Sequence, residues 1–301
     1  MTTARFSQNR AIIWLLVLVA FVILMILASV LTSGDKIQGV AWIVLTAIAI
    51  IAIYAVYFAT ARSTAWEVGT RQVVYMAIGA ALYGIFNYIF NTIPMPSVSQ
   101  VALRPSVCIP IFFGYMFGPV VGFFTGAVGN ILGDFLTGWG VYPVWDMGNG
   151  LMGMVPGLVM LFDDKRRSLN FLTGLVAVLI LIAAALVFIN PQVTGPFSGE
   201  LEDFSFWAWA FIIGGVVVVL GRFVLERVSV DLAAINLWGT LGIIVGIGFA
   251  AISDIWINGY SFATAIIGEF APAAGPNILN SMILSPILLA AYQAIRGRTG
   301  R

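Results

Sequence analysis

Long apolar runs separated by short polar breaks make up most of this chain of 301 residues. Most of the runs approach the roughly 20 residues that an α-helix needs to cross the hydrocarbon core of a bilayer. The pattern therefore predicts an all-α integral membrane protein with about ten transmembrane helices. We place them at about 11–33, 39–61, 72–93, 105–118, 119–137, 144–162, 171–189, 206–225, 234–255 and 276–295.

The predicted helices group into four parts by composition. Two pairs are bland hairpins of Ile, Val, Leu and Ala, whereas the other helices carry glycine, proline and polar side chains. Before the last helix, the long segment from Trp256 to Gly275 is too apolar for a solvated loop, and we expect a short helix at 261–270, lying over the outer face. The parts are an N-terminal hairpin at 1–65, four core helices at 66–165, an inserted hairpin at 166–230 and two further core helices at 231–301.

Basic residues fall almost entirely on one side of this topology. An even number of helices places both termini on the same side. If that side is the inside, only Lys36 and Arg104 of the 14 Lys and Arg residues lie outside. Cytoplasmic loops of membrane proteins carry such an excess of basic residues. The sequence therefore predicts a multi-pass protein with both termini cytoplasmic.

Composition excludes several kinds of chemistry. The chain is 61% hydrophobic and 9% charged, has no histidine, and has one cysteine, Cys108. These counts rule out a Ser-His-Asp hydrolase, a His-ligated zinc or haem site and an internal disulfide within this chain. The sequence also has no P-loop and no basic run for nucleic acid. We therefore expect no enzymatic activity, and no cofactor or metal held by this chain.

Small residues recur three or four positions apart on two predicted helices, which places them on one face of each helix. Faces of this kind either pack helices closely inside one chain or dock another membrane protein. Spacing alone leaves both interpretations open. The candidate docking residues are Ala77, Ala81, Gly122, Gly126, Gly129 and Gly133.

Polar and aromatic side chains gather near the outer level of the predicted topology. Indole faces stack on a ring or hold a cation, amides fix a ring edge, and a carboxylate pairs with an amino group. The set predicts a pocket for a small polar aromatic ligand, against the alternative of an interfacial aromatic belt with acids in contact with water. The candidates are Asn87, Asn91, Asp134, Trp139, Trp145, Asp146, Asn149, Glu269, Asn277 and Asn280, with Asn130, Tyr142, Asp254, Trp256 and Asn258 nearby.

The order of these features resembles the substrate-binding S component of energy-coupling factor (ECF) transporters. The similar stretches read AIGAALYGIFNYI, FFGYMFGPVVGFFTGAVGNILGDFL and YPVWDMGNGLMGMVPG, followed late in the chain by INLWGTLGIIVGIGFAAISDIWI and PNILNSMILSPILLAAY. The resemblance covers about 72–162 and 234–296, which is six helices. The extra hairpins, 11–61 and 166–230, depart from the six helices usual in that family.

The resemblance implies a subunit of a prokaryotic cell membrane that binds a vitamin or related micronutrient from outside. Such subunits dock on a transmembrane coupling subunit that carries two cytoplasmic ATPase subunits, so that ATP is used by the partners. By position, docking falls to Ala77, Ala81 and the helix of Gly122 to Gly133. Within the family, acidic and tryptophan side chains fit thiamine-like, pyrimidine or deazapurine ligands better than a ligand that bears a carboxylate. The implied ligand contacts are Asn91, Trp145, Asp146, Asn149, Glu269, Asn277 and Asn280.

Three other functions remain open from the residues alone. A stand-alone secondary transporter or channel would use an intramembrane carboxylate such as Asp134 or Glu269 to couple a proton or cation. An intramembrane enzyme would pair acids such as Asp134 and Asp146. A structural or assembly subunit would bind no ligand. Co-purification with ATPase partners separates the first of these from the ECF hypothesis.

Overall fold

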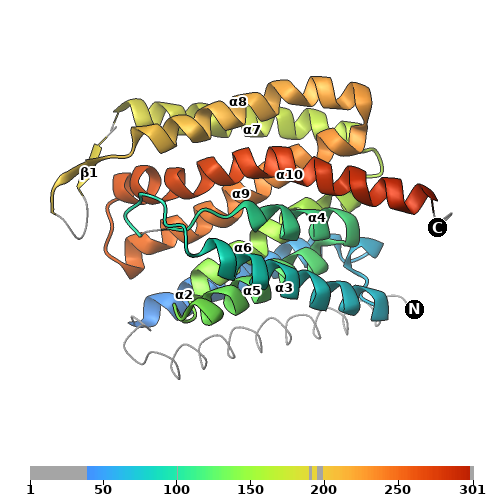
Figure 1. The fold of residues 1–301 in the computed structure, drawn as a ribbon, viewed down its shortest axis with the longest axis horizontal. Coiled ribbons are helices and arrows are strands. Elements are labelled where there is room, and N and C mark those ends of the chain that lie inside the picture. The colour runs from blue at the N-terminus through green and yellow to red at the C-terminus, as the bar shows by residue number, and fades with distance from the viewer. Residues whose placement is uncertain (1–38, 100, 190–191, 195–198, 299–301) are drawn as a thin grey trace.

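The computed structural model describes residues 39–99, 101–189, 192–194 and 199–298. These residues form a layered bundle of helices whose long axes run in similar directions (Figure 1). The first predicted helix, 11–33, lies outside the described residues. The described helices are α2 Gly39–Thr60, α3 Thr70–Phe90, α4 Cys108–Phe117, α5 Pro119–Thr137, α6 Pro143–Gly157, α7 Lys165–Ile189, α8 Ser205–Val228, α9 Val230–Ile257 and α10 Ala271–Arg298.

Shorter elements complete the described part of the chain. Three are 3₁₀ turns: η1 Thr64–Trp66, η2 Pro105–Val107 and η3 Leu158–Leu161. A small antiparallel hairpin of β1 Gln192–Thr194 and β2 Leu201–Asp203 connects α7 to α8.

The segment before α10 differs from the expected short helix over the outer face. It is a π-helix, η4 Thr264–Phe270, which runs directly into α10, and most of its residues are buried. Continuity with α10 explains its apolar sequence, because a helix inside the bundle needs no solvated side. The last helix therefore begins well before the predicted residue 276.

The predicted all-α class is confirmed for the described residues, apart from the short β-hairpin. Seven of the described helices are long and apolar enough to cross a membrane: α2, α3, α5, α7, α8, α9 and the joined η4 and α10. Helix α4 is apolar but short, and α6 is also shorter than a full span. Ten membrane crossings therefore stay a prediction.

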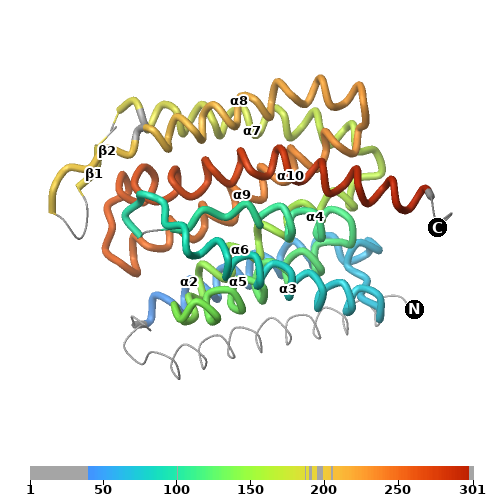
Figure 2. The backbone as a smooth tube through the Cα atoms, in the orientation of Figure 1, coloured from blue at the N-terminus to red at the C-terminus, as the bar shows by residue number. Residues whose placement is uncertain are grey.

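Helix α5 lies between α3 and α6, and α6 in turn packs against α4 and α9. Helices α9 and α10 pack together, so the late pair joins the earlier block although about 70 residues separate them in sequence. Figure 2 shows α7 and α8 on the far side of α9 and α10 from α3 and α5. This arrangement keeps α7 and α8 away from α5 and α6, whereas α2 contacts both α6 and α9.

The connection between α4 and α5 is the predicted sharp reversal. Gly118 has a φ of 106°, in a region that residues with a Cβ rarely adopt. Pro119 then occupies the first helical position of α5, where its missing N–H costs nothing. A two-residue Gly-Pro sequence therefore suffices to turn the chain back on itself.

Two glycines of α5 allow direct contact with α6. A Cβ added at Gly122 would overlap the carbonyl oxygen of Gly153, and one added at Gly126 would overlap that of Asn149. Both clashes involve backbone atoms, which cannot rotate away as a side chain end can. Helices α5 and α6 therefore approach each other backbone to backbone.

The other two glycines of the series contact α3 instead. A Cβ added at Gly129 would lie 2.8 Å from Tyr83, and one at Gly133 would overlap Asn87. The four glycines thus serve two contacts on different sides of α5, and all are buried within this chain. Close packing inside the chain accounts for them, so they present no surface for docking another protein.

Candidate functional site

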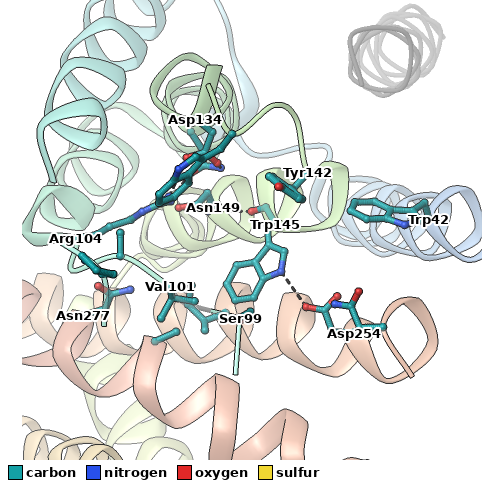
Figure 3. A pocket seen from close by; sticks show the side chains of 17 residues that line it. Trp42, Ser99, Val101, Arg104, Asp134, Tyr142, Trp145, Asn149, Asp254 and Asn277 are labelled. Atoms are coloured by element: carbon teal, nitrogen blue, oxygen red, sulfur yellow. Dashed lines mark hydrogen bonds and ion pairs between the residues drawn. The ribbon is translucent and has the colours of Figure 1, made fainter. Parts of the chain in front are cut away.

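A cavity of about 380 Å³ lies between α2, α5, α6, α9, α10 and the loop that precedes α4 (Figure 3). Aromatic, amide and charged side chains line it together. Five of the predicted binding residues are among them: Asp134, Trp139, Trp145, Asn149 and Asn277. The cavity therefore joins residues that are more than 140 positions apart in the sequence.

One wall of the cavity is built around an ion pair. Arg104 Nη2 lies 2.9 Å from Asp134 Oδ1, and only 12% and 5% of the two side chains are exposed. Asn130 precedes Asp134 by one helical turn on α5, so both side chains project from the same face. Asn130 Nδ2 donates to Asp134 Oδ2 at 2.8 Å, and Asn91 Nδ2 donates to Asp134 Oδ1 at 3.0 Å. The carboxylate is thus fully engaged by one cation and two amides.

The charge on Arg104 is secured by this arrangement. Burial is the largest single influence and would lower the pKa of the guanidinium, but Asp134, Tyr83 and Asp146 together outweigh it, so the pKa of Arg104 lies above its ordinary value. Arg104 also donates to Asn91 Oδ1 at 3.1 Å and to Asn130 Oδ1. The guanidinium therefore presents a fixed positive charge at the cavity wall at every physiological pH.

Three predicted residues lie behind this wall rather than in it. Asp146 accepts from Asn130 Nδ2 at 2.7 Å, and Asn87 accepts from Ser106 Oγ at 2.7 Å. Asn91 holds Arg104 and Asp134 as described above, and none of the three predicted residues lines the cavity. These side chains orient the residues that do line it, because each buried amide or carboxylate needs partners to offset its desolvation.

The opposite wall carries an indole and a second carboxylate. Trp145 Nε1 donates to Asp254 Oδ2 at 3.0 Å, as the dashed line in Figure 3 marks. Asn149, one turn after Trp145, donates to the Trp145 carbonyl at 2.9 Å and accepts from Tyr83 at 2.6 Å. Hydrogen bonds thus hold Trp145 both at its indole N–H and at its backbone carbonyl.

Two further predicted residues do not reach the cavity. Glu269 is fully buried in η4 and accepts a hydrogen bond from Ser99, which itself lines the cavity. Asn280 lies one turn deeper on α10 than Asn277, and only Asn277 lines the cavity. Glu269 therefore supports the loop that contains Ser99.

Sequence reasoning missed several residues that line the cavity, among them the polar or aromatic side chains of Trp42, Ser99 and Arg104. Arg104 did carry a signal, because it is a lone basic residue on the side otherwise depleted of basic residues. Trp42 carried none, since it lies in an apolar run whose composition predicts a hairpin without polar side chains. Of the neighbouring residues, Asn130, Tyr142, Asp254 and Asn258 also line the cavity, whereas the exposed Trp256 does not.

Comparison with known proteins finds a family that is similar to part of this chain. Residues 67–191 match the family model of the ECF-type riboflavin transporter, S component. The segment holds α3 to α7, and hence Arg104, Asp134, Trp145 and Asn149. The matched family consists of transporter subunits, not enzymes, which agrees with the prediction. The match and the seven long apolar helices together indicate a multi-pass membrane protein.

Curated relatives match a shorter stretch. A UPF0397 protein of Vibrio atlanticus is 39% identical over 99 residues, which are 32% of this chain and 52% of that protein. A UPF0397 protein of Aliivibrio salmonicida is 36% identical over 100 residues, 33% of this chain and 54% of that protein. The chain thus spans about half the length of the curated relatives it matches. No solved structure matches significantly.

Residues 234–296, which resemble the last two helices of S components, lie outside the matched segment, so this similarity stays an expectation. Within the matched segment, the sequence motifs and the family model agree. The resemblance of this chain to the S components of ECF transporters is therefore confirmed over residues 67–191.

Proposed function

We propose that this chain is the membrane-embedded substrate-capture subunit of an ATP-driven, ECF-type uptake transporter. Its substrate would be a vitamin or related small heteroaromatic micronutrient. The observation that carries the proposal is the cavity itself, which combines indole walls with a polar network around Arg104 and Asp134 and is built largely by the segment that matches S components. Pre-formed cavities of this size and character are typical small-molecule sites.

The chemistry of the lining supports a planar ring with polar edges. Trp139 and Trp145 offer faces on which a ring stacks, while Asn149 and Asn277 offer amides to its edge. The Arg104 charge suits a carbonyl or ring-nitrogen acceptor. A flavin is the first ligand to test because the matched family model is described by riboflavin, followed by thiamine, pyrimidine and deazapurine compounds.

The position of the cavity supports capture from the outer side. In Figure 1 the β-hairpin and the start of α10 lie at one end of the bundle, and the end of α8 and the C-terminal end of α10 lie at the other. The cavity is lined by Ala273 and Asn277 near the start of α10, whereas Lys165 begins α7 and Arg227 lies in the last turn of α8. Basic residues concentrate on the cytoplasmic side. We therefore place the cavity outside and the C-terminus in the cytoplasm, with the N-terminus on the same side.

Binding of a defined ligand tests the proposal directly. The protein is purified in detergent and titrated with riboflavin, thiamine, a pyrimidine and a deazapurine, with native mass spectrometry and thermal shift as readouts. In a second experiment it is co-expressed with candidate coupling and ATPase subunits. Stabilisation by one compound and co-purification of the ATPase module support it. Absence of both ligand binding and an ATPase partner would instead favour a structural subunit. Ligand uptake by proteoliposomes that contain this chain alone would favour a secondary transporter.

Trp145→Ala is expected to weaken ligand affinity at least about tenfold, since it removes the ring face that closes one wall of the cavity. Isothermal titration of the ligand found above measures the change. Trp256→Ala is the matched control, because Trp256 is 62% exposed and does not line the cavity. Equal affinity of the two variants would remove Trp145 from the binding site.

We further propose that α3 docks the coupling subunit and its two ATPases through Ala77 and Ala81. Both alanines are exposed, whereas the glycines of α5 are buried. Small residues at spacing four allow a partner helix to approach closely. ATP would then be used by the partner subunits alone.

Ala81→Trp is expected to abolish co-purification of the coupling subunit while leaving ligand affinity within about twofold, because Ala81 lies on the exposed side of α3. A pull-down from co-expressing cells and a titration of the same preparation give the two measurements. Ala185→Trp on α7 is the control, since this alanine is also exposed on an apolar helix. Loss of the partner in both variants would contradict a specific role for α3.

A further inference from the structure

Helix α2 lies outside the segment that matches the family model, yet it closes part of the cavity. It packs against α6 and α9, the two helices that hold Trp145 and Asp254. Its side chain in the cavity wall is Trp42, which Figure 3 places beside Tyr142. A helix from the extra N-terminal hairpin thus contributes directly to the site.

Trp42 is packed rigidly in this wall. Its side chain belongs to a cluster with Val144, Ala250 and Ile257, and only 7% of the residue is exposed. Its ring centroid lies 6.4 Å from that of Tyr142, with the planes tilted by 34°. The indole therefore holds one orientation without help from solvent.

The indole N–H of Trp42 is buried and has no hydrogen-bond partner among the described residues. Three other indoles of the described chain are paired: Trp66 donates to Thr60, Trp145 to Asp254 and Trp238 to Ser168. Buried indole N–H groups normally find an acceptor, because leaving the group unpaired costs free energy. Trp42 is thus a buried donor that lines a cavity and lacks an acceptor within the described protein.

We propose that Trp42 is a substrate-contacting residue, whose N–H donates a hydrogen bond to an acceptor atom on the edge of a planar heteroaromatic substrate. This rests on the proposed function and adds a determinant of specificity to it. The acceptor is a ring nitrogen or a carbonyl oxygen, and the tilted Trp42 and Tyr142 rings guide the edge toward the donor. On this view α2 forms part of the binding unit.

Trp42→Phe tests the proposal, because phenylalanine keeps an aromatic ring and removes the donor. Wild-type protein and variant are titrated with riboflavin, and with thiamine, a pyrimidine and a deazapurine, by isothermal titration calorimetry. The variant is expected to bind the wild-type ligand about tenfold more weakly, since a buried acceptor on the ligand loses its partner. Trp256→Phe is the matched control and is expected to leave affinity unchanged.

Thermal unfolding of each variant separates binding from folding, and Trp42→Leu is a second variant with the same expected loss if Trp42→Phe does not fold. If the wild-type protein binds a ligand and Trp42→Phe binds it with the same affinity, the role of Trp42 is overturned while the proposed function stands. No binding of any compound by the wild-type protein would overturn the proposed function, and the role of Trp42 with it.

Discussion

Replacing Asp134 with alanine is expected to lower the stability of the protein by about 3–5 kcal/mol and to abolish ligand binding. The variant leaves the Arg104 guanidinium, of which only 12% is exposed, buried without its counter-charge, and arginine stays protonated in proteins. It also removes one acceptor from each of two buried amides, Asn130 and Asn91. Thermal unfolding in detergent measures the first effect, and titration of the ligand measures the second.

A more exposed ion pair provides the control for Asp134→Ala. Arg166 lies 3.5 Å from Glu226, and 66% of the Arg166 side chain is exposed. Solvent and salt screen such a pair, so Arg166→Gln is expected to change stability by no more than about 1 kcal/mol. Similar unfolding midpoints for the two variants would show that Arg104 is hydrated after all, and that the ion pair does not shape the cavity.

Replacing Gly122 with alanine is expected to destabilise the fold by at least about 3 kcal/mol, the upper part of the range for overpacked interiors. The added methyl would overlap the carbonyl oxygen of Gly153 and would crowd Gly114, and all of these are backbone positions. Helices α5 and α6 would have to separate, and Asn130 and Asp134 on α5 would move away from α6. Loss of thermal stability, together with weaker ligand binding, is the expected result.

Gly174→Ala on α7 is the matched control for Gly122→Ala. Nothing lies within 4 Å of a Cβ added at Gly174, so this change is expected to be neutral or to stabilise the helix by up to about 1 kcal/mol. A Gly122→Ala protein of wild-type stability that fails to bind a partner would contradict internal packing, and would return the glycines of α5 to the docking surface.

The sequence predicted the helices well because each bilayer-spanning segment must satisfy its own backbone hydrogen bonds. The reversal at Gly118 and Pro119 was also predictable, since these residue types have local conformational preferences. Prediction was weaker at the last helix. There the π-helical turn η4 joins α10, and neither hydrophobicity nor residue type distinguishes a continuous helix from two helices separated by a break.

The candidate site was predicted in part. Asp134, Trp145 and Asn149 were expected in a pocket and do line the cavity. Asp146 was expected beside them but lies behind, in contact with Asn130. The roles of lining residue and supporting residue depend on the rotation of each helix about its axis, because neighbouring residues of a helix point about 100° apart. Sequence spacing fixes relative faces within one helix but not the direction in which those faces point.

By itself, the sequence determined the membrane-spanning character, the positions of most helices and the gathering of polar residues at one level, because each follows from local composition and from the cost of polar groups in lipid. Only the tertiary structure decided that the α5 glycines bind α6 and α3 rather than a partner, that Arg104 neutralises Asp134, and that Trp42 of α2 reaches the cavity. The reason is that such contacts join segments far apart in the chain, and helix packing determines which of them meet.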